Sequence, residues 1–166
     1  MVTIREVSDS ADIAEIRALF EEYLRSLGID LGFQGFDEEL AGLPGAYSRP
    51  TGCLLLAAIG VRSAGCVAVR RLETDICEMK RMFVRPEARG KGVGRALAKA
   101  AVAFGCAAGY HKMRLDTLPT MAAAQALYRQ LGFREAPPYR YNPVPGALFM
   151  DLVLNEESHA ALGEQR

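Results

Sequence analysis

The chain has 166 residues, a length typical of one domain and short for two. Half of its residues are hydrophobic and 24% are charged, a globular composition that excludes a disordered or fibrous protein. Basic and acidic residues number 20 each, so the formal net charge is zero. This balance argues against nucleic acid or an anionic membrane as a partner, because both usually require a basic surplus. Uncharged stretches such as residues 52–61 and 100–110 fall well short of the roughly 18 residues of a spanning helix.

The N-terminal residues and the cysteines indicate the compartment. Residues 1–6 lack the basic and then apolar pattern of a secretory signal, so a cytoplasmic location is expected. The four cysteines form no CxxC pair and the chain has two histidines, so no metal site is expected. All four stand in apolar stretches and are predicted to be small, buried, reduced thiols: Cys53, Cys66, Cys77 and Cys106.

In the first half of the chain, a strand, a helix and three further strands are predicted. Residues 2–7 indicate the first strand, after which Asp9 or Ser10 can cap a helix that stops at Gly28. The apolar positions of that helix follow spacings of three and four: Ile13, Ile16, Phe20, Tyr23 and Leu27. Residues 28–50 indicate a loop with a short helix. The strand-like runs then cover residues 52–59, 64–72 and 76–84, and the turn residues between them favour an antiparallel meander.

The second half alternates helices and strands. A glycine-rich stretch leads into an alanine-rich helix that reaches about Ala108 and stops at Gly109. A strand over residues 112–117 is followed by a helix over 121–131, closed by Gly132. Two more strands flank the proline-rich segment 137–145, the second of them over residues 147–154. The last residues, 155–166, are predicted to form a polar C-terminal tail.

This order of elements predicts the fold class. A meander followed by strand–helix–strand gives an α/β fold with a mixed, mainly antiparallel central sheet that is flanked by helices. No repeat or linker divides the chain, so residues 1–154 are predicted to form a single domain.

The glycine-rich turn before the alanine-rich helix is the most informative segment. Glycines stand at positions 90, 92 and 94, and residues 78–99 contain seven basic residues against two acidic ones. The first amides of a helix have no internal partners and carry partial positive charge. Glycines let a large anion approach those amides closely. The pattern favours a phosphate or diphosphate site over an ordinary glycine-rich turn.

Two common phosphate motifs do not fit this turn. The P-loop pattern GxxxxGK(S/T) is absent, because Lys91 precedes Gly92 and no hydroxyl residue follows. The dinucleotide pattern GxGxxG is absent as well, because the third glycine has the wrong spacing. An enzyme that uses a nucleoside triphosphate is therefore disfavoured.

Two motifs resemble those of the GNAT N-acetyltransferase superfamily. Arg89-Gly90-Lys91-Gly92-Val93-Gly94 matches the signature (Q/R)-x-x-G-x-(G/A), and Met82-Phe83-Val84-Arg85-Pro86 is similar to its usual lead-in. The later run Ala124-Gln125-Ala126-Leu127-Tyr128-Arg129-Gln130-Leu131-Gly132-Phe133 is similar to the family's A-x-x-L-Y-x-x-x-G-F helix end. The order of elements resembles the family over residues 2–154.

The resemblance implies a GNAT-like (acyl-CoA N-acyltransferase) fold with acetyl-CoA as co-substrate. Backbone groups of Met82, Phe83 and Val84 would hold the pantetheine arm, and a backbone amide near Phe83 would polarise the thioester carbonyl. The strands over residues 76–84 and 112–117 would splay to form the cleft. The diphosphate would lie on the turn and helix start: Arg89, Gly90, Lys91, Gly92, Val93, Gly94 and Arg95.

The resemblance also suggests catalytic residues. Tyr128 matches the family's tyrosine that protonates the departing sulfur; the alternative is an aromatic residue that packs in the core. Glu78 and Asp116 are candidates for the general base, and each could instead be a structural or solvated acid. Met121 stands where the family often has an asparagine that contacts the cofactor.

The residues expected near the acceptor entrance carry the weakest signal. Six acidic residues there hint at a cationic amine acceptor, and solvated loops explain them equally well: Asp30, Asp37, Glu38, Glu39, Glu73 and Asp75. Tyr139, Arg140 and Tyr141 could line the same entrance.

The function implied is an acetyl-CoA-dependent N-acetyltransferase that acts on a primary amine of a small molecule or protein. A non-catalytic acyl-CoA-binding sensor or partner module is the alternative. The expected partners are acetyl-CoA and an amine acceptor, and a homodimer is left open.

Overall fold

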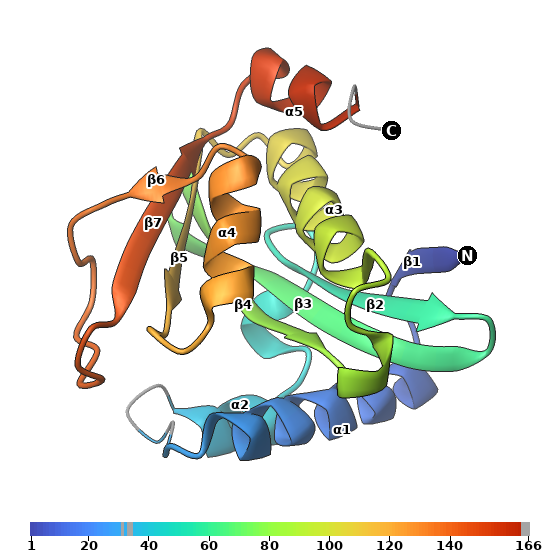
Figure 1. The fold of residues 1–166 in the computed structure, drawn as a ribbon. Coiled ribbons are helices and arrows are strands. Elements are labelled where there is room, and N and C mark those ends of the chain that lie inside the picture. Colours follow the sequence, from blue (N-terminus) through green and yellow to red (C-terminus); the bar gives the residue numbers. More distant parts are fainter. Residues whose placement is uncertain (31, 33–34, 164–166) are drawn as a thin grey trace.

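The computed structural model describes residues 1–30, 32 and 35–163, and its core is a single twisted sheet (Figure 1). Within these residues seven strands pair in the order β1-β2-β3-β4-β5-β7-β6. The pairing of β4 with β5 is parallel, and every other pairing is antiparallel. The strands are β1 (Val2–Glu6), β2 (Cys53–Ile59), β3 (Arg62–Glu73), β4 (Ile76–Val84), β5 (Lys112–Thr117), β6 (Arg134–Glu135) and β7 (Leu148–Val153).

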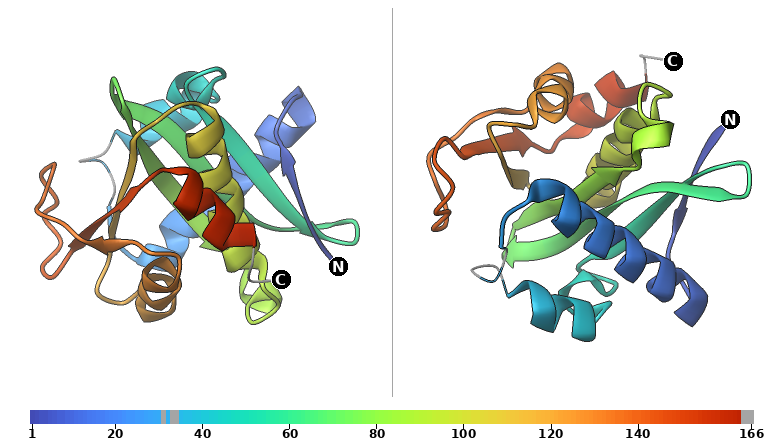
Figure 2. Two further views of the ribbon diagram at one scale, coloured as in Figure 1. Left: turned by 90° about the horizontal axis from the view of Figure 1, so that it is seen from above. Right: turned by 60° about the horizontal axis from the view of Figure 1, so that its bottom comes forward.

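Helices cover both faces of the sheet (Figure 2). Helices α1 (Ser10–Leu27) and α2 (Phe36–Ala41) lie on one face, and α3 (Val93–Ala107) and α4 (Ala122–Gln130) lie on the other. Alternation along β3 supplies both cores, because Val67 and Val69 pack on the α3 side while Cys66 and Ala68 pack on the α1 side. The sheet therefore separates two apolar cores.

Helix α1 forms as its sequence predicts. The Asp9 side chain caps the helix by accepting a hydrogen bond from the Asp12 amide at 2.8 Å. Ile16 and Phe20 are fully buried against the sheet, and Gly28 ends the helix in the left-handed conformation, with φ of 64°.

Strands β4 and β5 separate after a short paired segment. Their parallel register covers only residues 76–78 of β4 and 112–114 of β5. On its other side β4 continues to pair with β3, but the pairing contains a β-bulge. Lys80 pairs with Ala68 and Phe83 pairs with Cys66, so β4 has one residue more than β3 between these two pairs. Beyond residue 78, the edge of β4 that faces β5 therefore has no strand partner, and a gap separates the two strands.

The fold class agrees with the prediction, a mixed and mainly antiparallel sheet flanked by helices. One difference lies in the C-terminal segment, where residues of the predicted polar tail form α5 (Glu156–Gly163) against α3. The Leu162 carbonyl accepts a hydrogen bond from Lys99 Nζ at 2.8 Å, a long-range contact that local sequence does not reveal. Residues 164–166 of that segment lie outside the described residues.

The cysteines are free, as predicted. Cys53, Cys66 and Cys77 are buried, and burial raises the pKa of each thiol. Cys106, on α3, is only half-buried, so the prediction that all four thiols are buried is wrong at this position. In the described part of the chain, no helix is long and apolar enough to cross a membrane.

Candidate functional site

The glycine-rich turn adopts a conformation that requires glycine at two positions. After β4 and one turn of 3₁₀ helix (Pro86–Ala88), Gly90 and Gly92 have φ angles of 75° and 81°. Other L residues rarely adopt this left-handed region, because a Cβ crowds the following carbonyl. A Cβ added at either position would meet no atom within 4 Å, so the requirement comes from the backbone itself.

The backbone amides of Gly90, Lys91, Gly92, Val93 and Gly94 make no hydrogen bond with the described residues. The first helical bond of α3 runs from the Ala96 amide to the Gly92 carbonyl at 3.0 Å, and no side chain caps the helix. Such amides at a helix start carry partial positive charge and suit an anion. This row of available donors agrees with the predicted diphosphate site.

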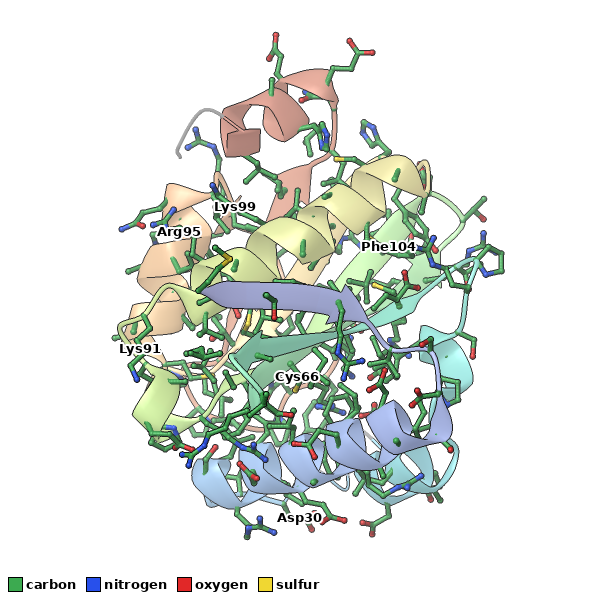
Figure 3. All side chains as sticks on the ribbon, turned by 90° about the vertical axis from the view of Figure 1, so that its right-hand side faces the viewer. Asp30, Cys66, Lys91, Arg95, Lys99 and Phe104 are labelled. Carbon is green, nitrogen blue, oxygen red and sulfur yellow. The ribbon has the colours of Figure 1, made fainter. Side chains whose placement is uncertain are left out.

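The basic side chains around the turn divide into separate groups. Figure 3 shows Lys91, Arg95 and Lys99 on one side of the molecule, Lys91 in the turn and the other two on the first half of α3. Arg95 contacts the Gln130 side chain, while Arg89 Nε donates to the Val84 carbonyl at 3.3 Å. Arg85 instead pairs with Glu22 at 2.8 Å and Glu15 at 3.3 Å on α1, so its charge is already balanced.

A large cavity of about 600 Å³ begins at this turn and extends along the unpaired edge of β4. It lies between the end of β4, the turn, the starts of α3 and α4, and the side of α1. The cavity contains most of the predicted cofactor-binding positions and is lined among others by Met82, Phe83, Val84, Arg89, Gly90, Gly92, Val93, Gly94, Arg95 and Met121.

The bulge in β4 lies where the large cavity meets the gap between β4 and β5. Arg81 has φ of 58° and is, among the described residues, the one non-glycine in the left-handed region. Its guanidinium is held by both carboxylate oxygens of Glu39, at 2.8 and 3.1 Å, and stacks 4.9 Å from the Phe36 ring centroid. Strained residues held in place by such contacts are typical of functional sites, where a bulge changes the direction in which backbone N–H and C=O groups point.

A second, small cavity of about 50 Å³ lies between the separated parts of β4 and β5. Tyr128 lines it from α4 and Asp116 lines it from β5. The Tyr128 hydroxyl makes no hydrogen bond with another described residue, and burial raises its pKa. Asp116 accepts a hydrogen bond from Asn142 Nδ2 at 3.1 Å. The structure thus brings two of the three predicted catalytic residues into one cavity.

Glu78, the third predicted catalytic residue, lies outside both cavities. Its side chain is fully buried. One carboxylate oxygen accepts from Arg70 Nε at 2.8 Å, and the other accepts from the Tyr139 hydroxyl at 2.7 Å and contacts Arg140. Tyr139 and Arg140, expected at the acceptor entrance, therefore serve to enclose Glu78, whereas Tyr141 is largely exposed.

Two residues of the small cavity have no role in the sequence-based prediction. Lys80 lines it from β4, and Tyr23 lines both cavities from α1. Burial lowers the pKa of Lys80 to about 7 and raises the pKa of Tyr23 to about 12. A signal for Lys80 existed, since a lysine in the middle of a strand that reads as central is unusual. Tyr23 is indistinguishable in sequence from the apolar stripe of α1.

Two of the six acidic residues expected near the acceptor entrance are held in ion pairs. Glu39 is paired with Arg81, and Glu73 is paired with Arg114 at 3.3 Å. Burial alone would raise the pKa of Glu39, but the hydrogen bond and charge of Arg81 outweigh burial and the net shift is downward. Two of the six acidic residues that suggested a cationic acceptor are therefore neutralised by arginines, which weakens that prediction.

Comparisons with known proteins agree with this geometry. Residues 50–135 match the family model described as Acetyltransferase (GNAT) domain. An uncharacterized N-acetyltransferase of Schizosaccharomyces pombe is 39% identical over 157 residues, which cover 93% of this chain and 96% of that protein. The human N-acetylaspartate synthetase is 33% identical over 110 residues, which cover 65% of this chain and 36% of that protein.

A solved structure shows the same fold. The acetyltransferase of the GNAT family from Staphylococcus aureus Mu50 superposes with a TM-score of 0.75 at 21% identity. The superposition covers 93% of this chain and all of that one. The sequence-based resemblance and the fold are thus supported independently.

Proposed function

Because the chain belongs to the GNAT acetyltransferase family, we propose that it is an acetyl-CoA-dependent N-acetyltransferase. It transfers the acetyl group directly to a primary amine of a small molecule or protein. The observation that carries the proposal is the row of available amides at Gly90–Gly94, at one end of a cavity that adjoins the small cavity of Tyr128.

The residues present fit coenzyme A. Five consecutive residues with available amides, two of them glycines in open left-handed conformations, provide donors for a diphosphate. The edge of β4 beyond residue 78 has no strand partner on the β5 side, so backbone groups of Met82, Phe83 and Val84 can hold an extended pantetheine arm. Acetyl-CoA supplies an activated acyl group as its thioester.

Proton transfer is the task left to the side chains. An alkylamine with a pKa of about 10.4 is charged at neutral pH, so its ammonium must lose a proton before nitrogen attacks the carbonyl carbon. The base takes this first proton and passes it to solvent. The carbon–sulfur bond then breaks as Tyr128 donates its hydroxyl proton to the departing sulfur, and the second proton lost by the nitrogen restores the Tyr128 hydroxyl, so that one proton is released per turnover.

Asp116 is the better supported base of the two candidates. It lines the small cavity with Tyr128, and its carboxylate has a single hydrogen-bond donor, Asn142, within the described residues. Glu78 is enclosed by two arginines and a tyrosine, which leave its oxygens little capacity to accept a proton. We assign Glu78 a positioning role, in which it holds Arg70 and Tyr139 beneath the cleft.

The acceptor is proposed at the level of a primary amine. The name of the human relative, N-acetylaspartate synthetase, supports an amino acid as one acceptor within that class. That relative is matched over about a third of its own length, so the acceptor has to be argued from the cleft of this chain.

Two measurements on the full chain test the proposed function. Calorimetry should detect acetyl-CoA binding at micromolar concentration, and a CoA-release assay over amino acids, polyamines, aminoglycosides and peptides should identify an acceptor. No acetyl-CoA binding at high micromolar concentration would remove the proposal. Binding without CoA release from any amine would instead support a non-catalytic acyl-CoA sensor.

A further inference from the structure

We propose that Lys80 and Asp116 form a site for a zwitterion, in which Lys80 binds the carboxylate and Asp116 the ammonium of a free α-amino acid. The inference rests on the proposed function, because the acceptor amine has to reach the cavity that Tyr128 lines. It goes further by naming the chemical class of the acceptor and the residues that select it.

The two side chains line one cavity from different strands. Lys80 comes from β4 and Asp116 from β5, in the part where these strands no longer pair. The register of β4 and β5 places Glu78 beside Arg114, so Lys80 and Asp116 are the next residues along the same face of each strand. No ion pair joins these two described side chains. A ligand with both charges can bridge them.

Lys80 lacks the partner that a buried cation normally has. The residue is 7% exposed, and its amino group makes no hydrogen bond or ion pair with any described residue. Burying an ammonium without a partner costs free energy, and an anionic ligand would supply the missing partner. Burial and the charges of Arg81 and Arg70 lower the pKa of Lys80, while Glu39 and Asp116 oppose this effect weakly. A carboxylate beside Lys80 would relieve this destabilisation.

The other charged groups near the gap form ion pairs within the protein. Four arginines pair with three glutamates, because Arg70 and Arg140 share Glu78, and Arg140 Nε makes no hydrogen bond with a described residue. Asp116 has only the neutral Asn142 amide, so among the described charged residues that line the small cavity, Lys80 and Asp116 are the two that no ion pair holds. The pairs are Arg70 with Glu78, Arg81 with Glu39, Arg114 with Glu73, and Arg140 with Glu78.

This arrangement selects among amines. A free α-amino acid carries its ammonium and carboxylate on one carbon, so binding its amine at Asp116 brings a carboxylate towards Lys80. A polyamine or an aminoglycoside would place uncompensated positive charge near Lys80, which like-charge repulsion disfavours. The N-terminal residue of a peptide has the amine but no α-carboxylate, so it leaves Lys80 without a partner.

The test compares free L-amino acids with the matching L-amino acid α-amides as acceptors. Wild type should show a kcat/KM at least about a hundredfold higher for the best amino acid than for its amide. Lys80→Met should lower this ratio by about thirtyfold or more, because it removes one partner of a buried charge pair. Acetyl-CoA affinity, measured separately by calorimetry, should stay within about twofold of wild type.

Two controls keep the experiment interpretable. Lys112→Met removes a partly exposed lysine that pairs with Asp151 at the start of β5, so the ratio should not change. The Lys80→Met variant should fold with an equal or higher melting temperature, because methionine has similar length and removes a buried charge. A lower ratio in a well-folded variant thus reports on binding.

The outcomes are distinguishable. Equal use of the acid and the amide by wild type would overturn the zwitterion site while the acetyltransferase proposal stands. So would an equal loss for both acceptors in Lys80→Met, which would indicate general-base chemistry at Lys80. Acetyl-CoA binding with no CoA release from any amine would overturn the proposed function, and the zwitterion site with it.

Discussion

The surroundings of Tyr128 suit the general-acid role that we propose for it. Its ring packs against Phe133, with 5.7 Å between ring centroids, and this fixes the hydroxyl at the wall of the small cavity. Burial raises the pKa of Tyr128, so the hydroxyl stays protonated at neutral pH and is ready to donate. A CoA thiolate, whose parent thiol has a pKa of about 8.5, is a better leaving group when it receives that proton.

The variant Tyr128→Phe removes the hydroxyl and keeps the aromatic ring, so it separates the effect of the proton from the effect of ring packing. We expect kcat to fall by about a hundredfold, because a positioned general acid is lost. Acetyl-CoA affinity and the melting temperature should hardly change, because the ring remains and the hydroxyl has no hydrogen-bond partner in the described residues. Steady-state kinetics with calorimetry and thermal unfolding measure the three quantities. An unchanged kcat would contradict the acid role.

At the scale of elements, the sequence predicts those features that depend on interactions between residues close together in the chain. The apolar stripe and Asp9 cap of α1 and the stop at Gly28 depend on neighbours within one or two helical turns, so the predicted helix and the observed one agree. The bulge at Arg81 depends on the register between β3 and β4, and the α5 helix packs against α3 far away in sequence. Contacts of this kind cannot be seen in a local pattern.

The glycine turn offers a test of an element with a matched control. Gly92→Val should weaken acetyl-CoA binding by at least about tenfold, because a branched side chain disfavours the left-handed conformation that presents the amides. Gly109→Val introduces comparable strain at φ of 85°, past the other end of α3. Both variants should lose about 1–3 kcal/mol of unfolding free energy. Calorimetry should show weaker acetyl-CoA binding in Gly92→Val only; equal weakening in both would mean that the turn has no special role.

At the scale of the whole molecule, the sheet separates two cores and opens between β4 and β5. Helices α3 and α4 cover one face and α1 and α2 cover the other, and α1, α3 and α4 all contribute residues to the large cavity (Figures 1 and 2). The order of elements and both family motifs were visible in the sequence, and the proposed diphosphate turn and the proposed role of Tyr128 rest on those motifs. The ion pairs of Glu39 and Glu78 were not visible, because their partners Arg81, Arg70 and Arg140 meet them only when distant elements pack together.

Backbone amide NMR during a titration with coenzyme A tests the central assignment most directly. The account predicts that the amide signals of Gly90–Gly94 shift most as the ligand binds, since these groups have no partner among the described residues. The signal of Gly60, in the turn between β2 and β3, serves as an internal reference and should not move. Saturable binding that leaves residues 90–94 unshifted would contradict the account.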